Sequence, residues 1–172
     1  MIHDENPFVP DADQRDPVRR FRGRLASPVT IVTAGDDGHH AGLTVSSLNV
    51  VEGDPGSTQV VVGPLTDLWS VAGDTGRFIV HVCRASDRHL TEIFAGIRPS
   101  PGGVFAGLAV TASEWGPVID DLGDRVYCTV RDRSVIGYSG VITGTIDRVD
   151  IADLADPLVY FRGRYRSLGA LD

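Results

Sequence analysis

The sequence predicts a mainly β protein, a β-barrel with short helical inserts. Six to eight short runs rich in valine, isoleucine and threonine recur along the chain, and turns containing glycine or proline separate them. Only a few short segments have the spacing of an amphipathic helix. The chain of 172 residues is long enough for one domain with a hydrophobic core and too short for two domains that each bury a core of their own.

The N-terminal segment differs from the rest of the chain. Residues 1–16 contain many acidic residues and two prolines and show no hydrophobic period, so we interpret them as a flexible arm before one domain over residues 17–172. The arm lacks the apolar segment of a secretory signal, and no run in the chain approaches the length of a membrane helix. We therefore expect a cytoplasmic protein that does not enter a membrane.

A short basic helix is predicted at the start of the domain. It spans Pro17 to Leu25, with proline near its first turn, and ends at Gly23 or soon after. The arginines of this segment favour a solvated helix face. The alternative is a lid, or a segment that contacts an anion.

A hairpin with an unusual second strand follows. An apolar run, Pro28–Ala34, precedes a polar turn and then the strand Ala41–Val50. Because the neighbouring hydroxyl residues Ser46 and Ser47 break the alternation that begins around Thr44, we expect the strand to bulge or end there. From periodicity alone, the favoured interpretation is a strand end whose hydroxyls cap loose backbone groups. In the alternative, hydroxyls and freed N–H groups face a ligand.

Strands and a helix alternate in the next part of the chain. Thr58–Val62 is a β-branched run and predicts a strand. Thr66 is predicted to be the N-cap of a short helix that stops by Gly73. The alternating segment Arg77–Cys83 predicts a further strand.

A second short helix and a long loop come next. Ser86 is predicted to cap a helix from Asp87 to Ala95, and Gly96 is its C-terminal stop. The segment Ile97–Leu108 contains two prolines and three glycines, so we interpret it as a mobile surface loop of the kind that often carries function.

The last third of the chain is rich in β-branched residues and predicts four more strands. A turn is expected over Gly137–Gly140, and a bulge near Gly144. The predicted strands are Ala109–Ala112, Arg125–Ser134, Val141–Ile151 and Leu158–Phe161.

Composition excludes several kinds of chemistry. The net charge of −7 argues against nonspecific binding to nucleic acid. All 16 basic residues are arginine, which excludes the lysine of a phosphate-loop NTPase, a Schiff-base lysine and a lysine nucleophile. Cys83 and Cys128 lie in apolar strand-like runs, so we interpret them as small core residues. His39 and His40 are neighbours on a turn, which does not predict a metal site.

Four segments, in this order, resemble the flavin reductase-like family: Pro28–Ala34, Ala41–Ser47, Gly76–Val82 and Pro157–Tyr165. The resemblance covers about residues 21–166. It implies a split β-barrel of the Greek-key type, usually a homodimer, that binds FMN or FAD and passes a hydride from NADH or NADPH to the flavin. Many members supply reduced flavin to a separate monooxygenase, so a partner monooxygenase is implied as a possibility.

The resemblance also implies a set of cofactor-binding residues, with no catalytic acid–base residue and no metal ligand. Small hydroxyls and backbone N–H groups can hydrogen-bond the polar edges of a flavin ring, and hydride transfer needs aligned rings more than proton transfer. The residues assigned to the ring are Leu43, Thr44, Val45, Ser46 and Ser47. Those assigned elsewhere are Thr66 for the phosphate, and Tyr138 and Ser139 for the nicotinamide side. Arg162, Arg164 and Tyr165 could reach the site from the partner subunit and supply the positive charge missing near Thr66, or they could form a solvated basic tail.

Two segments depart from the family pattern. Members usually carry a basic residue followed by serine or threonine where this chain has residues 63–69, so only Thr66 and backbone N–H groups remain for the phosphate, beside Asp67. Members often have Gly-Asp-His where this chain has Gly137, Tyr138 and Ser139. Tyr138 could stack on a ring instead, or be an exposed turn residue.

Two functions follow from this comparison of residues. The first is an NAD(P)H-dependent flavin reductase, which by the resemblance could serve as the reductase component of a two-component monooxygenase. The alternative is a flavin- or deazaflavin-binding split barrel without reductase turnover.

Overall fold

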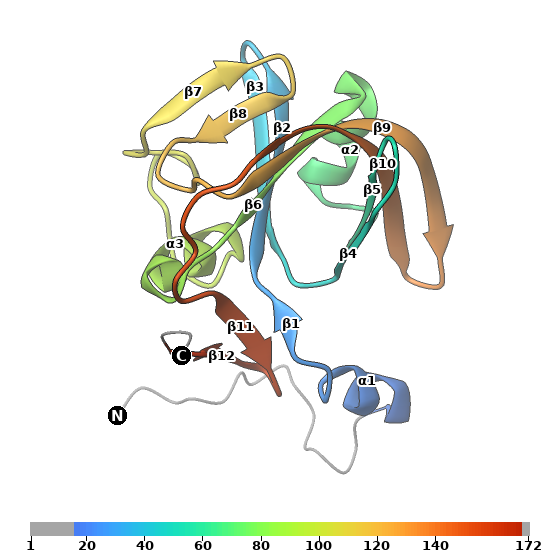
Figure 1. The fold of residues 1–172 in the computed structure, drawn as a ribbon, viewed down its shortest axis with the longest axis vertical. Coiled ribbons are helices and arrows are strands. Elements are labelled where there is room, and N and C mark those ends of the chain that lie inside the picture. The colour runs from blue at the N-terminus through green and yellow to red at the C-terminus, as the bar shows by residue number, and fades with distance from the viewer. Residues whose placement is uncertain (1–15, 170–172) are drawn as a thin grey trace.

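The computed structural model describes residues 16–169 and is mainly β with short helices, as the sequence predicts (Figure 1). The helices are α1 (Pro17–Arg22), α2 (Asp67–Thr75) and α3 (Arg88–Phe94), with a 3-10 turn, η1 (Ala85–Asp87), before α3. The strands are β1 (Ser27–Pro28), β2 (Thr30–Asp36), β3 (His39–Val45), β4 (Leu48–Val51), β5 (Ser57–Val62), β6 (Arg77–Val82), β7 (Val110–Ser113), β8 (Gly116–Ile119), β9 (Arg125–Ile136), β10 (Ser139–Asp150), β11 (Leu158–Phe161) and β12 (Arg164–Ser167).

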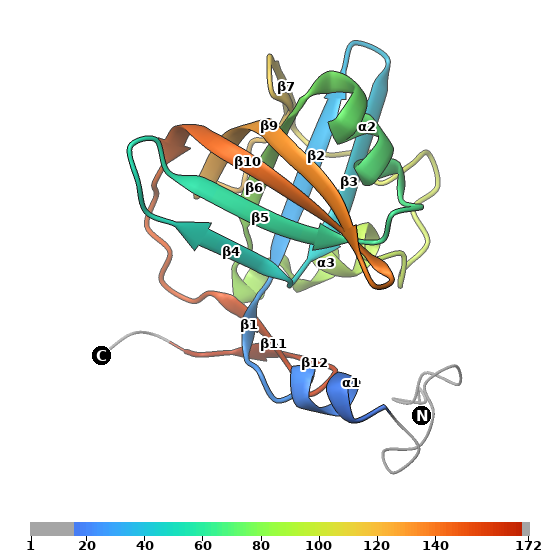
Figure 2. The ribbon, with the colours of Figure 1, turned by 90° about the vertical axis from the view of Figure 1, so that its right-hand side faces the viewer.

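Seven strands form one antiparallel sheet in the order β3-β2-β6-β9-β10-β5-β4. Its two edge strands, β3 and β4, follow one another in the chain, with only Ser46 and Ser47 between them. Because two residues join the two edges, the sheet has to curl round on itself. Figure 2 shows the resulting half-barrel, with β4 and β5 in front of β2 and β3. The predicted split barrel is confirmed.

A second, small sheet lies below the barrel together with α1 (Figure 1). Its strand order is β1-β11-β12. The backbone N–H of Arg162, in the turn between β11 and β12, donates to the carbonyl of Gly23 at the end of α1 (3.1 Å). The small sheet and α1 are therefore held together.

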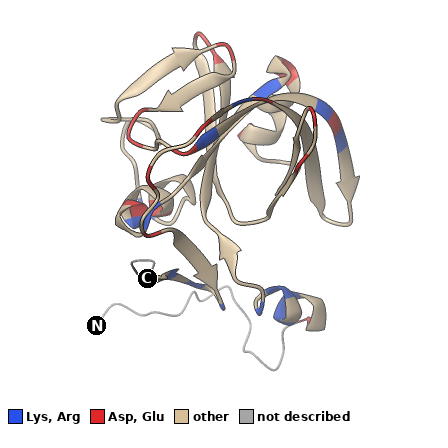
Figure 3. Cartoon of the chain, in the orientation of Figure 1, with Lys and Arg blue, Asp and Glu red and all other residues tan. Residues whose placement is uncertain are grey.

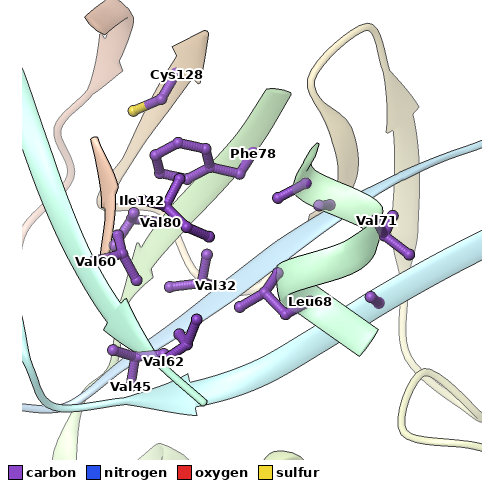
Figure 4. Packing of buried hydrophobic residues seen from close by; sticks show 13 residues of the cluster. Val32, Val45, Val60, Val62, Leu68, Val71, Phe78, Val80, Cys128 and Ile142 are labelled. Carbon is purple, nitrogen blue, oxygen red and sulfur yellow. The ribbon is translucent and has the colours of Figure 1, made fainter. Parts of the chain in front are cut away.

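The main core lies between the curled sheet and α2 (Figure 4). Leu68 and Val71 of α2 are buried against sheet residues such as Val32 and Phe78. Cys128 belongs to this core and Cys83 to a second cluster beneath α3; both are buried free thiols, as predicted. Burial raises the pKa of the Cys128 thiol to about 12, so it stays protonated and is not a nucleophile.

The predicted helix start at Thr66 is confirmed, because its Oγ1 accepts from the backbone N–H of Trp69 (3.3 Å). The predicted stop at Gly73 is wrong: α2 runs to Thr75 and ends at Gly76, which has a left-handed φ of 68°. Gly73 serves close packing instead, since a Cβ there would lie 1.0 Å from Nη1 of Arg133.

The predicted cap at Ser86 is also wrong. The carboxylate of Asp87 accepts from the backbone N–H of Arg84 (2.8 Å) and from its guanidinium (2.9 Å), which folds residues 85–87 into η1. The α-helix then begins at Arg88. These hydrogen bonds are charge-assisted and close η1, while Asp87 is the N-cap residue of α3 without a side-chain capping bond.

The strand assignments hold, with three additions. The bulge expected near Gly144 is confirmed by register shifts at Thr143/Gly144 and at Ile146/Arg148. Three short strands were not predicted. They are β1, with only two residues; β8, which contains proline; and β12, whose sequence is polar. All three are too short or too polar to produce a clear alternating pattern, and their pairing partners define them.

His81 joins three strands inside the fold. Its ring is fully buried, and the backbone N–H of Ile119 in β8 donates to Nε2 (3.2 Å). Nδ1 therefore carries the proton and donates to the carbonyl of Ile31 in β2 (3.1 Å). Burial lowers the pKa of His81 to about 4, so the imidazole is neutral at physiological pH.

Residues 1–15, most of the predicted arm, lie outside the described residues. Asp16, which we placed at the end of the arm, is the N-cap of α1: its carboxylate accepts from the backbone N–H of Val18 (2.7 Å). Within residues 16–169, no helix is both long and apolar enough to cross a membrane.

Candidate functional site

The two sheet edges meet at Ser46 and Ser47. β3 ends at Val45 and β4 starts at Leu48, so the expected strand end at the serine pair is confirmed. The carbonyl of Ser47 accepts from the backbone N–H of Val61 in β5 (2.9 Å), which fixes this linker against the sheet. The strand β3 pairs with β2 along one edge and has no strand partner along its other edge. The linker, together with the edge of β3 that has no strand partner, forms what we call the seam.

The hydroxyls along the seam have different uses. Oγ1 of Thr44 donates to the carbonyl of Thr91 in α3 (2.7 Å) and so holds that helix on the edge strand. Oγ of Ser47 accepts from the guanidinium of Arg22 (3.2 Å), which leaves the hydroxyl proton of Ser47 free to donate. Among residues 16–169, Ser46 makes no side-chain hydrogen bond, and it is half-buried. The serine pair therefore offers small polar groups in a partly dry position.

The aliphatic residues of this stretch face the core. Val45 is 4% exposed and belongs to the main core, so it can offer only backbone atoms to a ligand. Leu43 is half-buried and packs against the same core.

Thr66 lies close to the seam in the fold. It follows β5, the strand that bonds to Ser47, and its Oγ1 also donates to the carbonyl of Gly63 (2.7 Å). Asp67 occupies the first turn of α2. The segment from Gly63 to Asp67 contains no basic side chain. The guanidinium of Arg133, from β9, lies 4.2 Å from the ring centre of Trp69 and packs against Gly73, in the second half of α2.

The hairpin between β9 and β10 reaches the same end of the sheet (Figure 2). Gly140 pairs with Val62 at the end of β5 and packs under the ring of Trp69, which leaves no room for a Cβ. Tyr138 at the tip is fully exposed, and Ser139 begins β10. The serine pair, Thr66 and the hairpin tip thus surround one end of the half-barrel.

Arg162 and Tyr165 lie elsewhere, on the small sheet. Arg162 has a positive φ of 50° in the turn between β11 and β12 and is exposed. Tyr165 is half-buried in the second core cluster, and the guanidinium of Arg88 lies 5.7 Å from its ring centre. Burial raises the pKa of the Tyr165 phenol. Within one protomer, the fold does not bring these two side chains into the group around Thr66.

One residue at the seam, Arg22, is not among the site residues that the sequence predicts. Arg22 belongs to α1, whose arginines we interpreted as a solvated face, yet its Nη2 contacts Ser47. The density of arginines in residues 17–25 was the available signal. Figure 3 shows that basic residues gather on α1 and along the β11–β12 hairpin, although the chain as a whole is acidic.

The loop Ile97–Leu108 packs over β3. Phe105 contacts Phe94 edge to face (centroids 5.2 Å apart), and Gly42 leaves room for Phe94, since a Cβ would lie 2.4 Å from the Phe94 ring. Glu92, only 6% exposed, binds the guanidinium groups of Arg88 (2.9 Å) and Arg98. Burial would raise the pKa of the Glu92 carboxyl, but the hydrogen bonds from both arginines outweigh it, and the pKa is lowered.

Residues 22–169 match the family model described as the flavin reductase like domain. Among curated proteins, the NADH-dependent FMN reductase AsuE2 of Streptomyces nodosus subsp. asukaensis is 31% identical over 159 residues, covering 90% of this chain and 85% of that protein. The FMN reductase (NADH) RutF of Variovorax paradoxus is 26% identical over 164 residues, covering 95% and 89% of the two chains.

A solved structure with a similar fold is that of BorF, the flavin reductase component of a bacterial two-component tryptophan halogenase. It is 26% identical to this chain and has a TM-score of 0.78, with 90% of this chain and 98% of that one covered. The similarity extends over almost all of both chains.

Proposed function

Because this chain belongs to the flavin reductase-like domain family, we propose that it is an NAD(P)H-dependent flavin reductase, which transfers a hydride from reduced nicotinamide to FMN or FAD. The relatives named as NADH-dependent FMN reductases favour NADH and FMN. The observation that carries the proposal is the seam at Ser46 and Ser47. There, small hydroxyls and unpartnered backbone groups of β3 lie side by side at an open end of the half-barrel.

The residues of the seam suit a flavin ring. Such a ring is flat and apolar, with carbonyl and nitrogen groups along its edge, and when bound it supplies two-electron chemistry. The hydroxyls of Ser46 and Ser47 can donate to those edge groups, while Leu43 and the β3 backbone at Thr44 and Val45 offer an adjoining surface. Small side chains let the ring approach closely. The transfer needs alignment of two rings rather than an acid or a base, which fits this set of residues.

Thr66 and the start of α2 are proposed to hold the flavin phosphate. Backbone N–H groups at a helix N-terminus attract anions. Asp67 opposes this, because its carboxylate lies in the first turn and the segment from Gly63 to Asp67 has no basic side chain.

Tyr138 and Ser139 are proposed to contact the nicotinamide. The tyrosine ring is fully exposed at the hairpin tip, at the end of the half-barrel where Thr66 and the seam lie. An exposed aromatic ring can stack on a planar ligand at low entropic cost, because few of its torsions are free.

We also propose that the protein is a homodimer. Val50 and Val51 of the edge strand β4, Leu65, and Ile136 and Tyr138 of the hairpin are exposed apolar residues on the barrel. Burying them between two copies would remove this surface from water. In such a dimer, Arg162, Arg164 and Tyr165 could reach the partner's site. Light scattering after size-exclusion chromatography tests this: the mass of a monomer at micromolar concentration would contradict it.

A partner monooxygenase and a cytoplasmic location complete the proposal. The BorF reductase is one component of a two-component system, which supports a partner that consumes reduced flavin. Co-purification of a flavin-dependent monooxygenase with the tagged protein from its source cells, and cell fractionation, would test these two points.

The central test uses purified protein and three measurements. Added FMN should lose fluorescence on binding and change its visible spectrum, and NADH oxidation should then depend on added flavin. Absence of flavin binding would refute the proposal. Binding without NADH oxidation would favour the alternative, a flavin- or deazaflavin-binding barrel without turnover. That alternative draws support from one observation, the absence of a basic side chain between Gly63 and Asp67.

A further inference from the structure

Arg22 is held in place at the seam. The helix that carries it, α1, is fixed at its start by the Asp16 cap (2.7 Å to the N–H of Val18). Its end is fixed by the hydrogen bond from Arg162 to Gly23 (3.1 Å). Between these two anchors, Nη2 of Arg22 reaches Oγ of Ser47 (3.2 Å), 25 residues further along the chain. The contact follows from how the small sheet docks α1, and local sequence does not specify it.

Among the described residues, the guanidinium of Arg22 forms no ion pair with a carboxylate. Within residues 16–169, the arginines in ion pairs are those at positions 77, 84, 88, 98, 125 and 148, and none of them lies in α1. A guanidinium has five N–H donors, and the bond to Ser47 uses one of them. Arg22 and the Ser47 hydroxyl can therefore donate together to one anionic group.

We propose that Arg22 binds the polar edge of the flavin ring and stabilises the negative charge that the ring acquires on reduction. This inference rests on the proposed function. In that reaction a hydride, one proton with two electrons, leaves C4 of the dihydronicotinamide and bonds to N5 of the flavin. The nicotinamide becomes a cation, and the flavin gains a negative charge spread over N1 and the C2 carbonyl. A guanidinium beside this edge binds the reduced ring more tightly than the oxidised one, so it raises the reduction potential.

The position of Arg22 favours the ring over the phosphate. Arg22 contacts Ser47, a residue of the seam, whereas the groups suited to the phosphate are Thr66 and the backbone N–H groups in the first turn of α2. The two assignments also differ in thermodynamics. A phosphate carries the same charge in oxidised and reduced flavin, so an arginine that contacts only the phosphate affects both affinities alike.

The experiment compares the full-length protein with three variants. Arg22→Gln removes the charge, and Arg22→Lys keeps the charge but replaces the planar guanidinium with an ammonium group. Arg24→Gln is the matched control. Arg24 is an exposed arginine of the same segment, with no side-chain hydrogen bond among the described residues. Circular dichroism checks that each variant is folded. Calorimetry gives the affinities for oxidised FMN and riboflavin, and anaerobic titration against a reference dye gives the midpoint potential of the bound flavin.

We expect Arg22→Gln to weaken binding of reduced FMN about tenfold more than binding of oxidised FMN. For a two-electron couple this lowers the midpoint potential by about 30 mV. The same shift is expected with riboflavin, while Arg24→Gln leaves the potential unchanged and Arg22→Lys gives a smaller shift.

Two results would overturn the inference while leaving the reductase assignment intact. One is an unchanged potential in Arg22→Gln. The other is a loss of affinity confined to FMN and equal for both redox states, which would assign Arg22 to the phosphate. Wild-type protein that binds neither flavin would instead refute the proposed function, and the inference with it.

Discussion

Lowering the pH should destabilise this fold through one residue, His81. Its imidazole is fully buried, and both nitrogens are used by backbone groups of neighbouring strands. Protonation of Nε2 would place a second N–H against the N–H of Ile119 and would put a charge in the core. Because burial lowers the pKa of His81 from 6.5 to about 4, the unfolded chain binds the proton more readily than the folded one.

The sign and size of the effect follow from this difference. Stability is fully present above the unfolded pKa of 6.5 and falls with pH until the folded pKa of about 4 is reached. Linkage gives a loss of about 2 kcal/mol between pH 7 and pH 5, and of about 3 kcal/mol by pH 4. Carboxylates with lowered pKa values, such as Glu92 and Asp150, lose their stabilising effect only below about pH 4.5. The change in the free energy of unfolding between pH 7 and pH 5 therefore reflects mainly the protonation of His81.

Urea unfolding at pH 7, 6 and 5 measures the effect, with His81→Gln as the comparison. The amide of glutamine can donate and accept but does not titrate, so this variant should be less stable at pH 7 and nearly independent of pH down to pH 5. Parallel decreases in wild type and variant would refute the role of His81. A wild type whose stability is constant over this range would refute the lowered pKa itself.

Three further predictions concern the site and its surroundings. Thr66→Ala should weaken FMN binding more than riboflavin binding, and it should lower the free energy of unfolding by about 1 kcal/mol because the N-cap is lost. Thr66→Ser should retain the FMN affinity and the stability. Equal losses of affinity for the two flavins, measured by fluorescence quenching, would contradict the phosphate assignment. Gly42→Ala should cost about 1–3 kcal/mol in urea unfolding, because its Cβ would lie 2.4 Å from Phe94; an unchanged midpoint would mean that the ring moves freely. Glu92→Gln removes a buried carboxylate from between two guanidinium groups, so limited proteolysis should cut residues 97–108 faster. An unchanged rate would show that backbone hydrogen bonds to Glu92 and apolar packing hold the loop without the ion pairs.

The sequence predicted those features of the site that depend on neighbouring residues. Adjacent serines in an alternating strand predicted the end of β3, and Thr66 before Asp67 predicted the start of α2. The prediction failed at Gly73 and Ser86, where a side chain from a distant part of the sequence or a local ion pair decided the structure. Arg133 packs against Gly73, and the pair formed by Asp87 and Arg84 folds residues 85–87 into η1, so that α3 begins only at Arg88.

The amino-acid sequence by itself determined the longer strands, the turns between them and the short hydroxyl stretch, because hydrogen bonds and side-chain alternation within a few residues set them, whereas β1, β8 and β12 depend on their pairing partners. Only the tertiary structure decided that both edges of the sheet meet at Ser46 and Ser47, that the β9–β10 hairpin reaches the same end, and that Arg22 contacts Ser47. These contacts join segments tens of residues apart. They form only when the whole sheet curls and the small sheet docks α1, so no local pattern encodes them.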